Sequence, residues 1–506
     1  MKLSGILMGI DIGSSGSKGV LTDCGGRVIA TAEVSHSMSN PAPGCFEHDA
    51  MQVWWHDFCL LSRELIESAG IRNTEILGVG CSTISADCLP VDRELNPLRP
   101  AILYGIDTRA QRECEELNSR FGEERLISLM GHTLCSSDIM PKILWVRRHE
   151  PEVFEKTYKF LTGPSFLVAK LTGRCVMDRY NALAAYRPML DENGEPDPAF
   201  AHIVCRPDQL AQVLPTTEVV GGVSAEAARE TGLAEGTPVT TGTGDAGAEA
   251  IGTGVLTPGD MMLMLGSSNF MILCSDRKVA DSRLWISEYI LPGTSAVSAG
   301  MATAGTLTRW FRDTLFSDYV RLEQTGGPSA YERMYQAAGA IPAGSDGLVM
   351  LPYFAGERTP INDPKARGVL FGLTLGHTRE HLYRACLESV GYGIAQHFDI
   401  MRSLGAPIER VLAIGGGTRN PLWLSIIADI TGETLQTAQV TVGAAYGDAL
   451  LAGLGVGVFG SPRELKAIIA PGITVAPDPG RHAEYKPYRE LYDELYPATR
   501  ELMHRL

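Results

Sequence analysis

Two stretches of the chain share one pattern, a pair of apolar runs joined by a Gly-Ser-Ser turn. The first is LMGIDIGSSGSKGVL (Leu7–Leu21), and the second is VLTPGDMMLMLGSSNFMILC (Val255–Cys274). Apolar runs of this length on both sides of a Gly-rich turn predict a β-hairpin, because glycine tolerates the backbone angles that a tight turn requires. One such hairpin at the start of each half of the chain predicts a duplicated fold.

The rest of the chain alternates short apolar runs with segments of helical spacing, as α/β proteins do. A chain of 506 residues is also too long for a single hydrophobic core, so we expect two domains, residues 1–253 and 254–506. The expected strands are 3–12, 19–22, 27–34, 76–82, 238–243, 411–414 and 435–437, and the expected helices are 51–69, 139–148, 246–252, 420–431 and 443–454.

Charge and cysteine content exclude several classes of protein. The net charge of −15 argues against a nucleic-acid partner, which requires a basic surface. The 11 cysteines contain no C-x-x-C pair and no spacing typical of zinc sites, so we expect reduced thiols in a cytoplasmic protein. The apolar run at 261–274 is too short to span a bilayer, and we expect no membrane association.

The opening hairpin suits an anion but fits neither common nucleotide-binding loop. Lys18 follows Ser17 and precedes Gly19, and a second strand follows where both the P-loop and the dinucleotide fingerprint continue into a helix. Backbone N–H groups and serine hydroxyls can still donate to phosphate oxygens, and Lys18 adds a positive charge.

Asp11 is out of place beside a polyphosphate unless a cation lies between them. Mg²⁺ typically binds one or two carboxylates together with phosphate oxygens, so Asp11 is interpreted as a residue of a Mg·ATP site. Two alternatives stay open. The D-x-G-x-x-G spacing also resembles a methyltransferase cofactor loop, although that loop leads into a helix, and an aspartate at a strand end can simply cap a turn.

Two further groups of polar residues are candidates for catalysis and substrate binding. Asp245 in TTGTGDAGAEAIGTG follows an expected strand and could take the proton from a hydroxyl acceptor; its alternative role is that of a helix N-cap. Asp107 and Arg109 in AILYGIDTRA could bind a polyol through acceptor and donor groups, or could form a surface ion pair.

The chain resembles the FGGY family of carbohydrate kinases along its whole length. LPYFAGERTPINDPKARGVLFGLTLGHTREHLYRACLESVGYGI (351–394) is similar to the family's long C-terminal signature. GIDIGSSGSKG resembles the first phosphate loop, PLRPAILYGIDTRA the substrate segment, GTGDAGAEAIGTG the catalytic segment, LGSSN the second phosphate loop and AIGGGTRNPLWLSIIADITGE the adenosine loop.

This resemblance implies an α/β protein with two actin-like, ribonuclease-H-like domains around an interdomain cleft, with ATP and Mg²⁺ as cofactors. Sugar would bind mainly to the first domain and nucleotide to the second, and a homodimer is compatible with the family. Asp245 would be the general base, Asp107, Arg109 and Asp87 would join it in binding the sugar, and Asp11 would bind Mg²⁺ through water. The ATP phosphates would be lined by Asp11, Gly13, Ser14, Ser15, Ser17, Lys18, Gly266, Ser267 and Ser268, and the nucleoside by Gly305, Gly415, Gly416, Gly417 and Asn420.

The residues that precede the substrate segment depart from the family pattern. Xylulose kinases usually carry Gln-Met-His-Gly before the substrate segment and glycerol kinases carry Arg-Glu, whereas this chain has Thr83-Ile84-Ser85-Ala86-Asp87. The overall pattern is nearest to the xylulose kinase branch, so D-xylulose phosphorylated to D-xylulose 5-phosphate is the expected reaction. Ribulose, L-xylulose, erythrulose, glycerol and gluconate are the alternative acceptors. A non-catalytic actin-like nucleotide-binding module is the alternative from another class, but such a module needs no base at Asp245.

Overall fold

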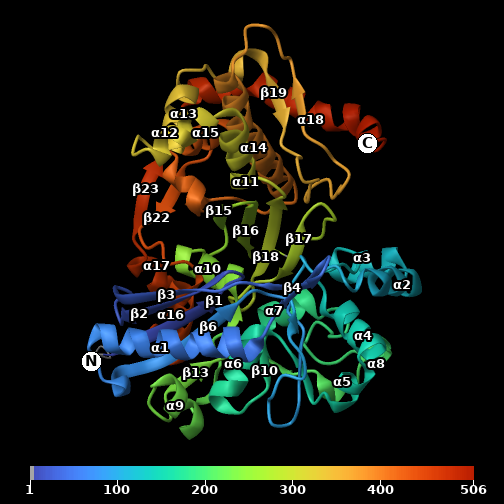
Figure 1. The fold of residues 1–506 in the computed structure, drawn as a ribbon, viewed down its shortest axis with the longest axis vertical. Coiled ribbons are helices and arrows are strands. Elements are labelled where there is room, and N and C mark those ends of the chain that lie inside the picture. The colour runs from blue at the N-terminus through green and yellow to red at the C-terminus, as the bar shows by residue number, and fades with distance from the viewer. Residues whose placement is uncertain (1–4, 278) are drawn as a thin grey trace. The chain divides into compact units, whose positions relative to one another are not determined.

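The computed structural model describes residues 5–277 and 279–506 as a mixed α/β protein (Figure 1). The chain divides into two compact units, each of which is described by itself. Unit 1 contains residues 1–257, 286–295 and 440–469, and unit 2 contains 258–285, 296–439 and 470–506. Within the described part of the chain, every helix is too short or too polar to cross a lipid bilayer.

Unit 1 is built on a sheet with strand order β12-β13-β6-β1-β2-β3. β1 is antiparallel to β2 and parallel to β6, and β14 pairs with the end of β6. This arrangement confirms the opening hairpin that the sequence predicts. The strands are β1 (Ile6–Ile12), β2 (Gly16–Asp23), β3 (Val28–Ser35), β6 (Ile76–Thr83), β12 (Val219–Gly222), β13 (Pro238–Thr240) and β14 (Thr243–Gly244).

Helices cover both faces of this sheet, which explains why β1 is an almost continuous apolar run. Helix α1 (His56–Ala69) packs on one face, where Leu61 and Leu65 lie over Gly19. Helix α16 (Ala444–Gly455) packs on the other face, so closely that a Cβ on Gly9 would lie 2.0 Å from the carbonyl oxygen of Ala445. Gly9 of β1 therefore allows α16 to approach the sheet backbone.

The other elements of unit 1 surround the sheet. Its remaining strands are β4 (Ser39–Ala42), β5 (Cys45–His48), β7 (Leu89–Val91), β8 (Ala101–Ile102), β9 (Lys159–Leu161), β10 (Val176–Asp178) and β11 (Gln212–Leu214). Its remaining helices are α2 (Gln111–Phe121), α3 (Glu123–Met130), α4 (Ile139–His149), α5 (Pro151–Lys156), α6 (Gly163–Thr172), α7 (Arg179–Ala185), α8 (Pro198–Val204), α9 (Ala225–Thr231), α10 (Asp245–Thr253) and α17 (Pro462–Ile468).

Unit 2 repeats the strand order of unit 1. Its sheet contains the order β18-β16-β15-β21-β22, in which β15 is antiparallel to β16 and parallel to β21, as β1 is to β2 and β6. The repeated order agrees with the duplication that the two Gly-Ser-Ser hairpins predict. The strands are β15 (Asp260–Leu265), β16 (Asn269–Ser275), β18 (Ser295–Met301), β19 (Val349–Leu351), β20 (Val369–Phe371), β21 (Arg410–Ile414), β22 (Leu435–Ala438) and β23 (Pro471–Val475), whereas β17 (Trp285–Glu288) belongs to unit 1 apart from Trp285.

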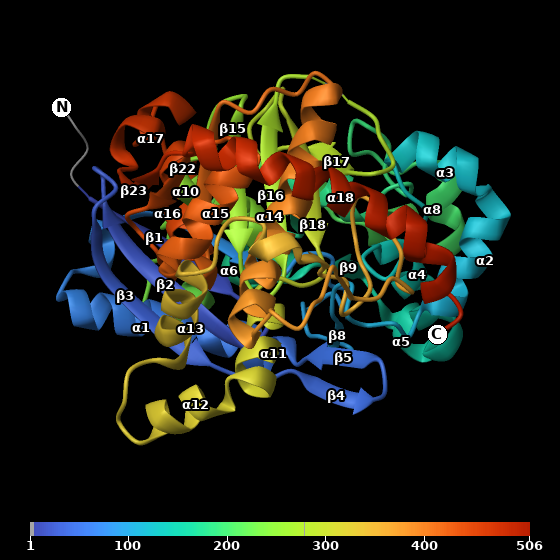
Figure 2. The same cartoon turned by 90° about the horizontal axis from the view of Figure 1, so that it is seen from above.

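The helices of unit 2 include two long ones, and α18 packs against both α14 and α15 (Figure 2). They are α11 (Gly305–Leu315), α12 (Ser317–Gln324), α13 (Ala330–Gly339), α14 (Arg379–Ser403), α15 (Pro421–Thr431) and α18 (Pro479–Met503). Trp423 on α15 lies in the buried interior and donates its indole N–H to the carbonyl oxygen of Leu387, 3.1 Å away.

The predicted elements are found with shifted boundaries. The helix predicted at 51–69 consists of a π-helical turn, Ala50–Trp55, followed by α1. The strand predicted at 238–243 is broken into β13 and β14, because Gly242 takes a positive φ of 74° between them. Leu3 and Ser4, at the start of the first predicted strand, lie outside the described residues.

Candidate active site

The turn of the first hairpin is held by a buried network. The N–H of Gly13 donates to the carbonyl oxygen of Gly16 at 3.0 Å and closes the turn. His36 lies below it, with Nε2 3.0 Å from the Gly13 carbonyl oxygen and Nδ1 2.8 Å from Asp57. The Ser17 hydroxyl donates to the same carboxylate at 2.6 Å and is fully buried. The Ser17 side chain therefore supports the loop from inside, while Ser14 and Ser15 are more accessible.

Asp11 and Lys18 are directly opposite each other on β1 and β2. Opposite positions place both side chains on one face, and the Lys18 ammonium favours the charged form of Asp11. Lys18 also lies 3.9 Å from Glu33 across the neighbouring strand. The hairpin thus holds a carboxylate and an ammonium side by side, as the sequence predicts for a magnesium and phosphate site.

Asp11 belongs to a three-residue network with Ser82 and Asp448. The Ser82 hydroxyl oxygen lies 2.9 Å from Asp11 Oδ1 and 2.7 Å from Asp448 Oδ2. A hydroxyl has a single proton, so it can donate to only one of the two carboxyl groups, and the other must carry a proton of its own. Burial and the charge of Asp11 raise the pKa of Asp448 well above its ordinary value. At least one of the two carboxyl groups therefore holds a proton, and the network orients the Asp11 side chain.

Asp245 is the first residue of α10, directly after β14. Its Oδ1 accepts the N–H of Ala246 at 2.7 Å, and burial raises its pKa to about 6. Glu249 lies one turn further along the same helix face, and burial together with the Asp245 charge raises its pKa to about 7. The sequence interpretation missed Glu249, although its spacing of four residues from Asp245 was a usable signal.

Asp11, Asp245 and Glu249 form one acidic cluster in unit 1. Burial raises the pKa of Asp11 to about 8, and the charges of Asp245 and Glu249 add to the shift. The negative charges in this cluster repel one another. Lys18 is the cation that counteracts this repulsion for both Asp11 and Glu249. A divalent cation is the ligand that relieves such repulsion, and the carboxylate oxygens are suitable donors for Mg²⁺.

The acidic cluster predicts how stability changes with pH. Because the three pKa values are raised, the folded protein binds more protons than the unfolded chain between about pH 4 and about pH 8, so the free energy of unfolding falls as the pH rises through this window. We expect Asp11→Asn, in chelator-treated and nucleotide-free protein, to lose less stability between about pH 5 and about pH 8 than the wild type. Urea denaturation at both pH values measures this difference, and equal pH dependence in the two proteins would contradict it.

The end of β6 and the residues after it lie beside Asp245. A Cβ on Gly244 would be 2.0 Å from the Ser85 hydroxyl, so this chain segment packs directly against the residue before Asp245. Ala86 has a positive φ of 63°, which is strained for a residue with a Cβ. Backbone strain of this kind is common at functional sites.

Asp87 follows this strained position and is completely buried. Apart from the backbone N–H of Tyr104, which lowers its pKa, the Asp87 carboxyl group has no hydrogen-bond partner among the described residues. Burial raises its pKa well above the ordinary value, opposed by the Lys142 ammonium and increased by the charge of Asp245. Lys142 is also buried, and it donates to the carbonyl oxygen of Ala86 at 2.6 Å. A buried carboxyl group with so few partners, next to the candidate base, is a suitable acceptor for a substrate hydroxyl.

Asp107 and Arg109 form a buried ion pair. The Arg109 guanidinium donates to Asp107 at 2.8 Å and to Glu47 at 2.7 Å, and its carbon lies 5.1 Å from the centre of the Trp145 ring. The N–H of Phe46 also donates to Asp107, at 2.7 Å. Of the two readings of these residues, the ion pair is the one found, although it is buried and not on the surface. Their contact with a sugar stays a prediction.

Three segments that the sequence assigns to ATP come together in unit 2. The carbonyl oxygen of Gly266 accepts the N–H of Gly305 at 2.9 Å, which joins the β15–β16 turn to the start of α11. Gly415 has a φ of +90°, and a Cβ there would lie 2.7 Å from the Leu265 carbonyl oxygen. Asn420 is the N-cap of α15 and accepts the N–H of Trp423 at 3.1 Å. The remaining predicted residues of this group are Ser267, Ser268, Gly416 and Gly417, in the same two turns.

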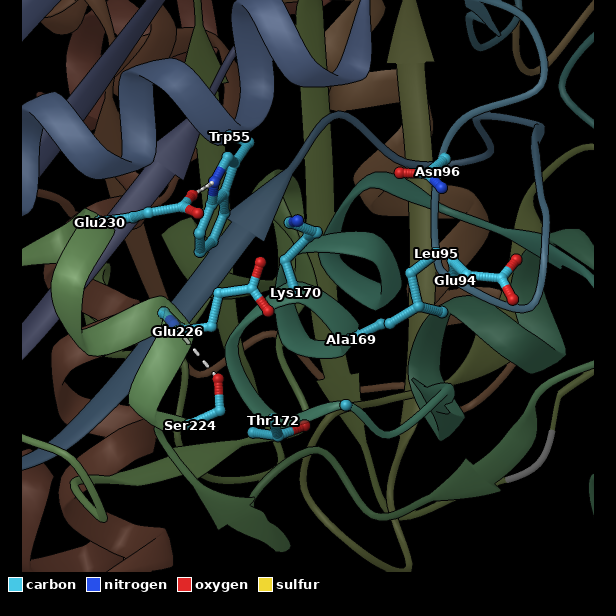
Figure 3. A pocket seen from close by; sticks show the side chains of 12 residues that line it. Trp55, Glu94, Leu95, Asn96, Ala169, Lys170, Thr172, Ser224, Glu226 and Glu230 are labelled. Atoms are coloured by element: carbon cyan, nitrogen blue, oxygen red, sulfur yellow. Dashed lines mark hydrogen bonds between the residues drawn. The ribbon is translucent and has the colours of Figure 1, made fainter.

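A separate pocket of about 290 Å³ lies in unit 1 between α6, α9 and the loop after β7 (Figure 3). The Trp55 indole N–H donates to Glu230 at 2.5 Å, and the Lys170 ammonium lies 5.4 Å from the centre of the Trp55 ring. None of the candidate site residues lines this pocket. Its lining residues are largely polar, and some of them bond to one another. We assign this pocket no role in the reaction.

Comparisons with known proteins agree with this geometry. The family model for the N-terminal domain of the FGGY family of carbohydrate kinases matches residues 6–252, and the model for the C-terminal domain matches residues 261–456. The chain is 31% identical over 499 residues to the xylulose kinase of Escherichia coli strain K12, covering 98% of this chain and 99% of that protein.

Other relatives lie in the same family. The chain is 27% identical to an autoinducer-2 kinase of Klebsiella pneumoniae, covering 97% of this chain and 92% of that protein. The crystal structure of xylulose kinase from Rhodospirillum rubrum superposes with a TM-score of 0.91 at 30% identity, covering 99% of this chain and all of that chain. The match extends over both domains and includes the two-domain, actin-like fold. This protein therefore belongs to the FGGY family of carbohydrate kinases.

Proposed function

We propose that this protein transfers the γ-phosphate of ATP to O5 of D-xylulose. The observation that carries the proposal is the position of Asp245, a half-buried carboxylate beside the strained strand end at Ala86 and next to the acidic cluster. The names of several relatives at 25–31% identity, all xylulose kinases, support the choice of acceptor. The domain assignment is part of the proposal, with sugar and base in residues 1–253 and nucleotide in residues 254–506.

The proposed reaction requires one base and little other covalent chemistry. Asp245 accepts the proton of the acceptor hydroxyl as its oxygen forms a bond to the γ-phosphorus, and the bond between this phosphorus and the β,γ-bridging oxygen breaks to release ADP. The raised pKa of Asp245, about 6, leaves the carboxylate ionised near neutral pH and closer to the operating pH than an ordinary aspartate. Asp245 ends the step protonated and returns the proton to solvent.

Positioning of the phosphates is assigned to the two glycine-rich turns. We propose that Gly13, Ser14, Ser15 and Lys18 in unit 1 bind phosphate oxygens of ATP, as do Gly266, Ser267 and Ser268 in unit 2. Ser17 contributes by holding the first turn through Asp57. Gly305, Gly415, Gly416, Gly417 and Asn420 are proposed to contact the nucleoside.

Mg²⁺ fits the acidic cluster, and Asp11 is the residue proposed to hold it through water. The fit rests on the carboxyl groups of Asp11 and Glu249, whose pKa values are raised by burial and further by the nearby charge of Asp245, and on the carboxylate oxygens that magnesium prefers. When bound, the ion neutralises charge on the phosphates. Ser82 and Asp448 orient Asp11 for this contact.

The acceptor is tested by ADP release from Mg·ATP against a panel of hydroxyl compounds. The panel contains D-xylulose, D-ribulose, L-xylulose, erythrulose, glycerol and gluconate. We expect the highest kcat/KM with D-xylulose. This result would identify Ser85, Ala86 and Asp87 as an alternative set of residues for binding the same sugar. A higher value for another compound would replace D-xylulose by that acceptor while leaving the kinase chemistry in place.

Asp87 should contribute to acceptor binding. Asp87→Asn keeps the size of the side chain but replaces one of its two oxygens by an NH2 group that can only donate, so we expect the KM for the acceptor to rise about tenfold or more and the KM for ATP to stay within about twofold. Asp208→Asn, on the exposed surface, is the matched control. Steady-state kinetics with both substrates varied measure the effect, and an unchanged KM for the acceptor would exclude contact with Asp87.

We also propose a cytoplasmic location, since the cysteines are all free thiols in the structure and an oxidising compartment favours disulfides. A homodimer stays a prediction of the family resemblance.

A further inference from the structure

The loop between α3 and α4 brings three residues with different metal-binding groups together. One ligand atom each from His132, Cys135 and Asp138 can be chosen so that all lie within 4.8 Å of one another, and His132 Nδ1 is 3.9 Å from Asp138 Oδ2. Across the part of the chain that the structure describes, no other group of three histidine, cysteine or acidic residues satisfies this distance. We propose that these three residues bind one zinc-like transition-metal ion.

The donor set points to zinc and away from magnesium. A thiolate, an imidazole and a carboxylate bind Zn²⁺ at about 2.0 to 2.3 Å, which places donor atoms of a tetrahedral site about 3.4 to 3.6 Å apart. Because the three atoms lie within 4.8 Å of one another, binding requires a contraction of at most about 1.4 Å, which side-chain rotation in a loop can supply. The soft thiolate disfavours Mg²⁺ and Ca²⁺. A water molecule would complete the coordination, as it does where zinc has three protein ligands.

The backbone of the loop is fixed in the metal-free protein. Asp138 is buried, and its Oδ2 accepts the N–H of Cys135 at 2.8 Å. The N–H of Asp138 in turn donates to the Cys135 carbonyl oxygen at 3.0 Å, so these two ligands share one tight turn. Asn118 of α2 binds both the N–H and the carbonyl oxygen of Leu134, at 2.8 and 2.9 Å. An ion therefore meets a site whose backbone is already ordered, which lowers the entropic cost of binding.

Charge and access also fit a divalent ion. A thiolate and a carboxylate balance the charge of Zn²⁺, and a neutral imidazole adds none. His132 Nδ1 now donates to the Thr133 carbonyl oxygen at 2.8 Å, and the metal takes the place of that proton. Cys135 is an exposed residue, while burial raises the pKa of its thiol, so the ion must displace the thiol proton when it binds. The spacing between cysteines in the sequence cannot reveal such a site, because its three ligands are of three different residue types.

The loop lies against the segment that precedes Asp107. The Ser136 hydroxyl donates to the Gly105 carbonyl oxygen at 2.8 Å, and a Cβ on Gly105 would lie 2.4 Å from the Ser137 hydroxyl. The proposed metal site nevertheless shares no residue with the candidate kinase site. Its test is therefore independent of the proposed reaction.

Cobalt titration of the full-length, reduced and chelator-treated protein tests the site in the presence of excess Mg²⁺. We expect one Co²⁺ per chain, an absorption band from charge transfer between thiolate and cobalt, and displacement of the cobalt by Zn²⁺. Cys135→Ser should abolish the band, and His132→Ala should weaken zinc binding by about tenfold or more. Cys45→Ser, a partly buried cysteine outside the group, is the control and should bind as the wild type does.

Alkylation of the wild-type protein provides a second measurement that needs no variant. Zn²⁺ should protect Cys135 from iodoacetamide, as followed by mass spectrometry of the peptide that contains it. Absence of the cobalt band in the wild type, retention of the band in Cys135→Ser, or equal alkylation of Cys135 with and without Zn²⁺ would each overturn the proposal.

Discussion

Replacement of Asp245 by asparagine is expected to lower kcat by about 10³-fold while leaving ATP affinity within about twofold. The amide has the shape of the carboxylate but cannot take a proton from the acceptor hydroxyl. Asp245 is the first residue of α10, after the N-cap Gly244, and its Oδ1 accepts the N–H of Ala246; an asparagine Oδ1 can accept the same hydrogen bond, so the fold should be preserved. Turnover by ADP release and ATP affinity by calorimetry measure the two effects separately.

The pH profile distinguishes a base from a structural residue at this position. Burial raises the pKa of Asp245 to about 6, so wild-type kcat should fall as the pH drops below that value and the carboxylate becomes protonated. The residual activity of Asp245→Asn should lack this limb. Glu226→Gln, an exposed acidic residue of the separate pocket, is the matched control. If Asp245→Asn kept more than about a tenth of wild-type turnover, Asp245 would not be the base.

Asp11→Asn should raise the Mg²⁺ concentration required for half-maximal activity by about tenfold or more. Asp11 is held toward the acidic cluster by Ser82, and its carboxylate is the group proposed to bind the hydrated ion. Because its pKa in the ligand-free protein is about 8, the magnesium affinity of the wild type should also rise with pH up to that value. Activity measured against Mg²⁺ at saturating ATP and acceptor checks both expectations.

The same substitution should make the ligand-free protein more stable near neutral pH, because Asp11, with a pKa of about 8, must take up a proton on folding and asparagine avoids this cost. If Asp11→Asn requires more Mg²⁺ for activity and yet is more stable than the wild type, Asp11 has a functional role and not a structural one. Glu67→Gln, on the exposed face of α1, serves as the control for both measurements. A Mg²⁺ dependence identical to the wild type would remove Asp11 from the metal site.

The sequence was sufficient to predict what depends on local pattern. The two hairpins, the parallel strand β6 and the helices α10 and α15 follow from apolar periodicity and turn residues, and all are found close to the predicted positions. The position of Asp245 at a strand-to-helix junction was equally visible, because glycines and an aspartate at such a junction favour a helix start.

Long-range contacts account for what the sequence did not reveal. Asp448 follows Ser82 by hundreds of residues, and only the packing of α16 on β1 and β6 places the two side chains together. Likewise, Ser17 was assigned to the phosphates because it lies in the turn, but its strand position directs the hydroxyl inward to Asp57. Residue type and spacing do not record which face of a strand a side chain occupies until the register is known.

Asp107 and Arg109 illustrate a different limit. Their spacing is compatible with both a polyol site and an ion pair, and the arrangement is decided by Glu47 and Trp145, which come from other elements. A carboxylate that already accepts from Phe46 and Arg109 has little capacity left for a substrate hydroxyl. Asp87, which has fewer hydrogen-bond partners than Asp107, is therefore the stronger candidate for contact with the acceptor.

The central claim, phosphoryl transfer from ATP to a ketose, is tested most directly by following ³²P from the γ-position of ATP. With D-xylulose present, the account predicts that label appears in a sugar phosphate in equal amount to the ADP formed, and that neither product accumulates at a comparable rate without the sugar. Tight ATP binding with no labelled sugar phosphate for any acceptor of the panel would contradict the account and indicate a non-catalytic nucleotide-binding protein.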